Sequence, residues 1–386
     1  MLRLDRLTLT DFRSYAALTW RPAARISVLY GPNGSGKTNL LEALSLLVPG
    51  RGLRGARNAD LPRQGGSGGW AVNARLRTPD GETSIGTGSE ADSDRRVFRL
   101  DGTAPRNQTD IARLIAAVWL TPQMDRLFQE GLTGRRRFLD RLVWALEPGH
   151  AREVAAHDTA VHSRNRLLAE GRQDRSWLTG LEDSIARHAV ADCAARMCMV
   201  TRLNAEIDAS IVSGFPPARV GLACPIAKRL GTEPALAVED WLRAGLGASR
   251  AGDAATGTTG LGAHRTDILL TDVATGTPAA LASTGQQKAL LIGVILAHAG
   301  LIAAVRGFAP LLLLDEPAVH LDADRRRALW DVLTSLPAQT VVTGTDADTF
   351  LPLAEQAEAF ATGGGLHPDG RFLRPETGAS PVRTAL

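Results

Sequence analysis

The chain has few cysteines and no long uninterrupted apolar run. Its three cysteines, Cys193, Cys198 and Cys224, have neither the C-x-x-C spacing of a zinc site nor the even number of a disulfide framework. The longest apolar run, 289–305, is interrupted by glycine and histidine and is shorter than the roughly 20 residues of a membrane span. The first residues alternate charged with apolar side chains, unlike a signal peptide. We therefore expect the cysteines to be small buried hydrophobes or inert thiols, in a soluble protein of the reducing cytoplasm.

Lysine is also rare, and the net charge is small. Only Lys37, Lys228 and Lys288 contribute lysine to the 44 basic residues, so arginine is the usual cation of this chain. Lys37 is then expected where a compact point charge is required. The 41 acidic residues leave a net charge of only +3, which excludes a polycation that coats nucleic acid indiscriminately. Contact with nucleic acid must come from local clusters of arginine.

The hydrophobic pattern predicts an α/β domain interrupted by a helical segment. Short apolar or alternating runs predict strands, including an antiparallel meander, at 2–9, 26–30, 70–76, 83–85, 97–100, 311–314 and 340–343. Helical spacing continues through 110–245 without a heptad pattern long enough for a coiled-coil arm. The predicted parts are an α/β head at 1–110, a helical lobe at 111–245 and a glycine-rich linker at 246–262. The second part of the head follows at 263–366, and a polar tail at 367–386.

A phosphate-binding loop is predicted between the apolar strand 26–30 and a helix at 37–47. The intervening residues read GPNGSGKT and match G-x-x-x-x-G-K-[ST]. Glycine lets backbone N–H groups curl around phosphates at the positive end of a helix. Lys37 would neutralise the β- and γ-phosphates of ATP, and the Thr38 hydroxyl would bind Mg²⁺. The residues predicted to bind nucleotide are Gly31, Pro32, Asn33, Gly34, Ser35, Gly36, Lys37 and Thr38.

Two carboxylates, Asp315 and Glu316, end the buried strand predicted at 311–314. Such a strand leaves both carboxylates at its C-terminal tip, where ligands bind in open α/β sheets. Asp315 would hold the Mg²⁺ shell, and Glu316 would polarise the attacking water. The alternative is a core strand with an acidic cap, which the phosphate-binding loop elsewhere in the chain disfavours.

The segment 283–288, Ser-Thr-Gly-Gln-Gln-Lys, directly precedes the apolar run and is similar to the signature motif of SMC and ABC ATPase heads. An ordinary helix cap is the alternative, because serine favours that position. The resemblance implies that Ser283, Gly285 and Gln286 contact the γ-phosphate held by a second subunit, with Asp322 as the D-loop residue of the same interface. The segment 343–345 stands where these ATPases carry a switch residue. We expect an α/β fold, an ABC-type P-loop ATPase head with a mixed sheet, an antiparallel meander and an inserted α-helical lobe.

Further segments resemble the RecF family over nearly the whole chain. They read DFRSY at 11–15, NLLEA at 39–43 and RGLR at 51–54. Further along the chain they read RRRFLD at 135–140, SRN at 163–165 and GAHRTD at 262–267. The chain departs from the family pattern G-P-H-R-D-D at Ala263 and Thr266. It also has D-E-P-A-V-H-L-D where the family has D-D-V-x-S-E-L-D, and Glu316 is at least as good a base as aspartate.

The RecF resemblance implies a weak, DNA-stimulated ATPase that dimerises on ATP and releases on slow hydrolysis. Its cofactors would be ATP and Mg²⁺, and its partners gapped or junction-containing duplex DNA, RecR and RecO, in loading recombinase at single-strand gaps. Gln123 stands where these ATPases place a metal-contacting glutamine. Arg13 would either approach the phosphates or lie on the surface.

Arginine clusters are the candidates for DNA contact, because phosphate neutralisation needs clustered cations. They lie at 51–57, 95–99, 135–137 and 164–175, and solvated faces or internal packing are the alternatives. Aromatic residues make up only 5% of the chain, so contact with the duplex backbone is favoured over base stacking. An ABC transporter subunit and an SMC-like ATPase of a defence system remain alternatives, whereas nothing in a P-loop kinase explains 283–288.

Overall fold

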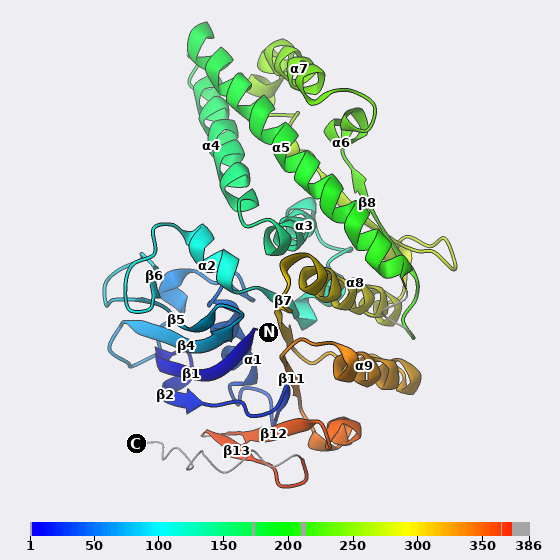
Figure 1. The fold of residues 1–386 in the computed structure, drawn as a ribbon. Coiled ribbons are helices and arrows are strands. Elements are labelled where there is room, and N and C mark those ends of the chain that lie inside the picture. Colours follow the sequence, from blue (N-terminus) through cyan, green and yellow to red (C-terminus); the bar gives the residue numbers. More distant parts are fainter. Residues whose placement is uncertain (1, 172–173, 210–213, 364, 373–386) are drawn as a thin grey trace. The chain divides into compact units, whose positions relative to one another are not determined.

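The computed structural model describes residues 2–171, 174–209, 214–363 and 365–372, and the chain divides into two compact units (Figure 1). We call the first unit the head; it comprises Met1–Asp125, Ser210–Pro216 and Ser283–Leu386. The second, called the lobe, comprises Arg126–Ala209 and Pro217–Ala282. The head thus extends past the boundary expected at residue 110, and most of the tail expected at 367–386 lies outside the described residues.

A five-stranded antiparallel sheet forms one layer of the head, in the order β2-β1-β4-β5-β6. It contains the meander predicted from the alternating pattern, and its inward-facing residues alternate with exposed ones as a sheet with one buried face requires. Its strands are β1 (Arg3–Phe12), β2 (Tyr15–Trp20), β4 (Trp70–Thr78), β5 (Gly81–Ser89) and β6 (Val97–Leu100).

The second sheet of the head is mixed and has the order β13-β12-β3-β11-β10-β7. Strands β7, β10, β11, β3 and β12 are parallel, and only β13 pairs antiparallel. Such strands are buried on both faces and read as continuous apolar runs. Their bounds are β3 (Ile26–Tyr30), β7 (Ala117–Leu120), β10 (Leu311–Leu314), β11 (Thr340–Gly344), β12 (Ala357–Thr362) and β13 (Leu366–Pro368).

Helices of the head connect these strands. They are α1 (Lys37–Ser45), α2 (Gln108–Leu114), α8 (Thr284–Arg306) and α9 (Ala323–Ser335), with short 3₁₀ turns η1 (Asn58–Asp60), η2 (Pro122–Arg126) and η5 (Ala347–Leu353). Helix α8 begins before the apolar run and has 23 residues, so by length and mean hydropathy, 2.1, it meets the requirements of a membrane span. It is buried along most of its length as a core helix of the head.

The lobe is mainly helical, as the spacing predicted. Its long helix α5 (Arg175–Asp208) packs against α4 (His150–Ala169) and α7 (Ala235–Thr256). Helix α7 continues through residues expected to form a glycine-rich linker at 246–262, because Val238, Leu242 and Leu246 bury one face of it. The remaining elements are α3 (Leu132–Leu146), α6 (Pro225–Leu230), the antiparallel strands β8 (Ala218–Ala223) and β9 (Asp267–Asp272), η3 (Ala263–Arg265) and η4 (Ala279–Leu281).

Arg164 lies inside the lobe with its side chain fully buried, which corrects its assignment to a DNA-contacting cluster. Its guanidinium donates to Glu182 at 3.1 Å, to Asp253 at 2.8 Å and to the carbonyl of Leu246 at 2.8 Å. These bonds join α4, α5 and α7. A buried arginine with this many acceptors acts as an internal cross-link.

We predict that Arg164→Met lowers the free energy of unfolding by about 3 kcal/mol, because it leaves Asp253 buried without its cation and leaves Glu182 with Arg250 as its remaining cation. Urea unfolding followed by circular dichroism measures this change. The matched control is Arg166→Ala on the same helix. Arg166 is 72% exposed and pairs with Glu170 one turn away, so its loss should cost at most about 0.5 kcal/mol. Equal effects for the two variants would contradict the cross-link.

Candidate phosphate-binding site

The loop 31–38 joins β3 to α1, as the sequence predicted. Gly31 has φ 146° and Gly36 has φ 97°, a region of backbone conformation that favours glycine. A Cβ at Gly31 would lie 2.7 Å from the Thr362 hydroxyl, and a Cβ at Gly36 would lie 2.8 Å from the Tyr15 hydroxyl. These two glycines therefore permit both the turn and the close approach of neighbouring strands.

Lys37 is buried at the start of α1, and its ammonium lies within the curve of the loop. Its Nζ donates to the carbonyls of Gly31 at 2.6 Å and Pro32 at 3.0 Å. Burial lowers the pKa of Lys37, and the nearby carboxylates of Glu316 and Asp315 oppose that shift. The loop thus holds a compact cation beside two carboxylates, which is the arrangement predicted from the motif.

The carboxylate of Asp315 joins three segments at the carboxyl edge of the sheet. Its Oδ1 accepts from the hydroxyl of Thr38 at 3.1 Å and from that of Thr343 at 2.7 Å. The backbone N–H of Glu316 donates to the Thr343 hydroxyl at 3.0 Å. Hard oxygen donors of this kind are the ligands that Mg²⁺ prefers, so Thr38 and Asp315 fit the predicted metal role.

Glu316 has a positive φ of 50°, which is uncommon for a residue with a Cβ. Its carbonyl accepts a hydrogen bond at 3.1 Å from the Nζ of Lys288, which comes from α8. The same ammonium lies 3.3 Å from Asp125 in η2. Desolvation raises the pKa of Asp125, and the charge of Lys288 opposes that shift. The sequence singled out Lys288 only as part of the signature segment and did not identify Asp125 as its partner.

Ser283 and Asp322 each begin a helix of the head and are exposed. Ser283 forms a capping box with Gln286 at the start of α8, and Asp322 accepts from the N–H of Arg325 at the start of α9. A Cβ at Gly285 would lie 3.2 Å from the carbonyl of His320, so the two helix starts are neighbours. Their predicted roles across a dimer interface stay predictions.

Comparisons with known proteins agree with this geometry. The model of the RecF/RecN/SMC N terminal domain matches residues 3–363. The DNA replication and repair protein RecF of Mesorhizobium japonicum is 46% identical over 359 residues, which are 92% of this chain and 94% of the relative. The chain belongs to the RecF family. RecF of Rhizobium etli strain CFN 42 is 44% identical over 367 residues, 94% of this chain and 97% of the relative.

Solved structures share the fold of this RecF family member. The recombination mediator protein RecF of the RecFOR pathway, solved with ATPrS, gives a TM-score of 0.83 at 21% identity, over 95% of this chain and 98% of that chain. The Smc head domain of Pyrococcus furiosus, bound to the C-terminal domain of ScpA, gives 0.52 at 16% identity, over 96% of each chain. The predicted ATPase head fold is confirmed, and the ABC transporter alternative is disfavoured.

Two further residues, Arg13 and Gln123, were singled out as possible contacts of the phosphates or the metal. Arg13 does not lie free on the surface: its guanidinium binds the buried carboxylate of Glu42 through two bonds of 2.8 Å, and its approach to the phosphates stays a prediction. It therefore anchors α1 to the turn after β1. Gln123 is exposed in η2, directly after β7, and its metal contact stays a prediction for this RecF family member.

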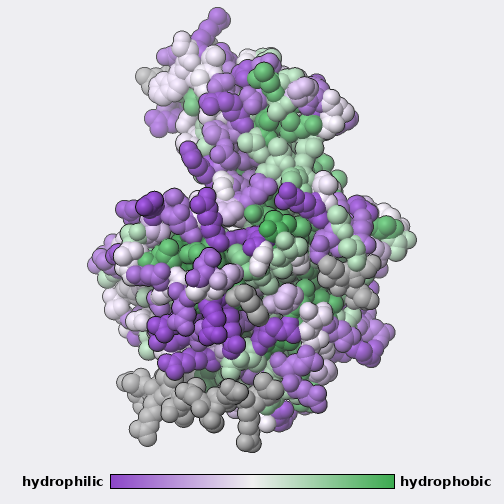
Figure 2. Space-filling view, in the orientation of Figure 1, coloured by the Kyte–Doolittle hydropathy of each residue, from purple (hydrophilic) through white to green (hydrophobic). Residues whose placement is uncertain are grey.

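Several of the arginines proposed for DNA contact are used inside the molecule. Arg96 donates to the carbonyl of Val48 at 3.2 Å near the end of α1, and Arg135 binds Asp267 through two bonds of 2.7 and 2.8 Å. Arg136 donates to the carbonyl of His264. The arginines of 51–57 are exposed, and Figure 2 shows hydrophilic residues with smaller apolar areas over the face drawn. Within this segment Arg54 also binds the carboxylate of Glu42 and Arg57 that of Asp60, each at 3.2 Å, so part of its charge is already paired.

We predict that Lys288→Met lowers the free energy of unfolding by about 3 kcal/mol, because Asp125 loses its buried cation. A double-mutant cycle with Asp125→Asn is measured by urea unfolding. The double variant should lose at least about 1 kcal/mol less stability than the sum of the losses of the two single variants. The control is Lys228→Met, an exposed lysine of the lobe, with a change within about 0.5 kcal/mol. Strict additivity of the two single changes would show that Lys288 and Asp125 do not interact.

Proposed function

We propose that this chain binds ATP and Mg²⁺ in the head and that two copies close around the nucleotides on DNA during recombinational repair of replication gaps. The observation that carries the proposal is the contact of Asp315 with both Thr38 and Thr343, beside a buried Lys37. These groups come from three segments that are far apart in the sequence. Their assembly at one edge of a parallel sheet is the arrangement that a phosphate and its cation require.

Bound ATP with Mg²⁺ would supply the phosphoanhydride bond whose hydrolysis separates the two copies. On the protein side, Lys37 would offset phosphate charge, and Thr38 with Asp315 would hold the cation through oxygen atoms. Glu316 would orient a water and accept its proton. The bond from Lys288 to the Glu316 carbonyl supports this role, because it fixes the backbone that carries the base.

The dimer interface would be formed by the starts of α8 and α9. Ser283, Gly285 and Gln286 would reach the nucleotide of the second copy, and Asp322 would lie across the same interface. Exposure of Ser283 and Asp322, and the closeness of Gly285 to His320, support one continuous surface. A helix start offers backbone N–H groups and a positive dipole end to a phosphate.

The wider role rests on the relatives named as DNA replication and repair proteins and on the recombination mediator of the RecFOR pathway. We infer gapped or junction-containing duplex DNA as the ligand, with RecR and RecO as partners in the cytoplasm. Hydrolysis would be weak, stimulated by DNA, and would act as a release step. The exposed arginines of 51–57 are the first candidates for contact with DNA phosphates.

We predict that Glu316→Gln slows ATP hydrolysis on the order of 100-fold, because it removes the general base. Dimers formed with ATP should then persist and retain gapped duplex. Gel filtration with light scattering, with and without ATP and DNA, measures both effects. Lys37→Met should remain monomeric with ATP, whereas the exposed-lysine control Lys228→Met should behave as the wild type. A Glu316→Gln protein that stays monomeric with both ligands would remove the proposal.

We predict that Ser283→Arg prevents dimerisation with ATP while the monomer still binds nucleotide, because a long cation would occupy the interface. Equilibrium binding of a fluorescent ATP analogue and gel filtration separate the two properties. Asn107→Arg is a matched control, since Asn107 is also an exposed N-cap of the head with a capping box. Both variants lose a cap worth about 1 kcal/mol, but only Ser283→Arg should lose the dimer. Loss of the dimer in both would assign the effect to stability alone.

A further inference from the structure

Two of the three cysteines, far apart in the sequence, meet inside the lobe. The Sγ atoms of Cys193, on α5, and Cys224, which precedes α6, are 3.6 Å apart. Both belong to the apolar core of the lobe. A disulfide has an S–S distance of about 2.05 Å, so the sulfurs must approach by roughly 1.5 Å. Rotation of two short side chains can cover such a distance without a new fold.

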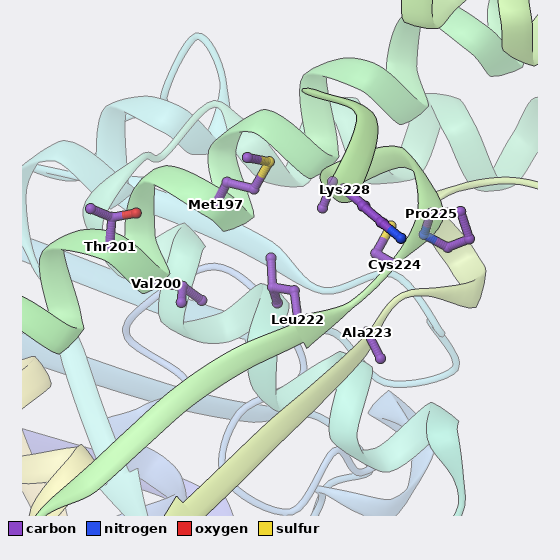
Figure 3. Close-up of a pocket in the computed structure, with 9 residues that line it drawn as sticks. Met197, Val200, Thr201, Leu222, Ala223, Cys224, Pro225 and Lys228 are labelled. Carbon is purple, nitrogen blue, oxygen red and sulfur yellow. The ribbon is translucent and has the colours of Figure 1, made fainter. Parts of the chain in front are cut away.

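The two thiols differ in how a reagent in solution can reach them. Cys193 has no exposed surface, whereas Cys224 is 7% exposed and lines a pocket of ≈ 950 Å³ in the lobe. Figure 3 shows Cys224 at this pocket with Met197 of α5 and Leu222 of β8. The pocket also holds Lys228, an exposed cation one helical turn after Cys224. Of the two cysteines, Cys224 is therefore the one that borders a space open to a reagent, and Lys228 would attract an anionic one.

The surroundings of Cys224 also favour its thiolate. The hydroxyl of Thr266 donates to the sulfur at 3.1 Å. Hydrogen bonds from Cys193, Thr266 and nearby backbone N–H groups lower the pKa of Cys224 to about 6, against the effect of burial. The bond to Cys224 and burial raise the pKa of Cys193. In a thiol pair of this kind the accessible sulfur is the nucleophile and the buried one follows.

We propose that Cys193 and Cys224 are a redox-sensitive pair that forms a reversible disulfide between α5 and the start of α6, with small anionic disulfides entering at Cys224. The Cys224 thiolate attacks a disulfide RS–SR, so that a Cys224–SR bond forms and RS⁻ leaves. The Cys193 thiol gives its proton to RS⁻ and attacks the sulfur of Cys224, and the second RS⁻ leaves. One protein thiolate and one protein thiol are oxidised to a disulfide, and the small disulfide is reduced to one thiol, RSH, and one thiolate, RS⁻.

The disulfide would act on the loop 262–267. Thr266 is fully buried and loses its thiolate acceptor when the bond forms. The neighbouring Asp267 pairs with Arg135, and the carbonyl of Ala263 accepts from Arg196, so this loop ties together three parts of the lobe. Formation of the disulfide would therefore change the contacts of a loop that binds both α3 and α5.

The test uses the full chain and oxidised glutathione as the probe. After incubation the free thiols are alkylated, and non-reducing peptide mapping by mass spectrometry identifies the linked residues. We expect a Cys193–Cys224 linkage that dithiothreitol reverses, with Cys198 alkylated. A map in which Cys198 carries the linkage or the adduct, or in which all three thiols stay reduced, would overturn the proposal.

Three variants assign the order of the two steps. Cys198→Ala is the matched control, on the same helix as Cys193, and should form the linkage as the wild type does. Cys193→Ala should stop at a glutathione adduct on Cys224, and Cys224→Ala should leave Cys193 unmodified. An adduct on Cys193 in the last variant would overturn the entry at Cys224. If a variant does not fold, the wild-type peptide map alone decides the linkage.

Discussion

The register of three parallel strands determines whether the phosphate site of the head can form. Thr38 follows β3, Asp315 follows β10 and Thr343 belongs to β11, which lies between them. Val342 pairs with both Leu314 and Val28, so Asp315, directly after Leu314, lies at the level of Thr343. A slip by one residue would turn the Thr343 side chain to the opposite face of the sheet and separate it from Asp315. The contact of Asp315 with two hydroxyls therefore depends on the sheet as a whole.

Strands that end in an obvious polar signal could be located from the sequence. The runs at 26–30, 97–100 and 311–314 are short, apolar and closed by glycine or carboxylates, and their observed bounds are the same. Strand β7 was missed, because four apolar residues inside a region of helical spacing cannot be distinguished from a helical turn. It becomes a strand by pairing with β10. The end of helix α7 was also predicted wrongly, because the glycines after residue 245 suggested a linker. Burial of the apolar face of α7 outweighs the low helix propensity of these glycines, and the helix continues to Thr256.

The site residues were predictable where one motif carries the chemistry and unpredictable where the partner is distant. Lys37 and Asp315 follow from local patterns, whereas the pairing of Lys288 with Asp125 joins residues 163 positions apart. Arginine shows the same limit. In a chain with three lysines, arginine supplies the internal cross-links as well as the surface charge. Five N–H donors allow Arg164 to satisfy several carbonyl and carboxylate groups at once, so its presence in a basic stretch does not indicate exposure.

At residue 266, where this chain departs from the RecF pattern, the side chain that is present has a defined contact in the lobe. The family pattern has aspartate at this position, and here the threonine hydroxyl donates to the sulfur of Cys224. A carboxylate in the same place could not donate to this sulfur when ionised, and it would carry a charge into the apolar core of the lobe. Thr266 and the cysteine pair are therefore mutually compatible, while Asp267 retains the ion pair with Arg135 that holds the loop. Thr266 and Cys224 are 42 residues apart and meet only in the folded lobe. The contact between them therefore cannot be predicted from either segment of the sequence alone.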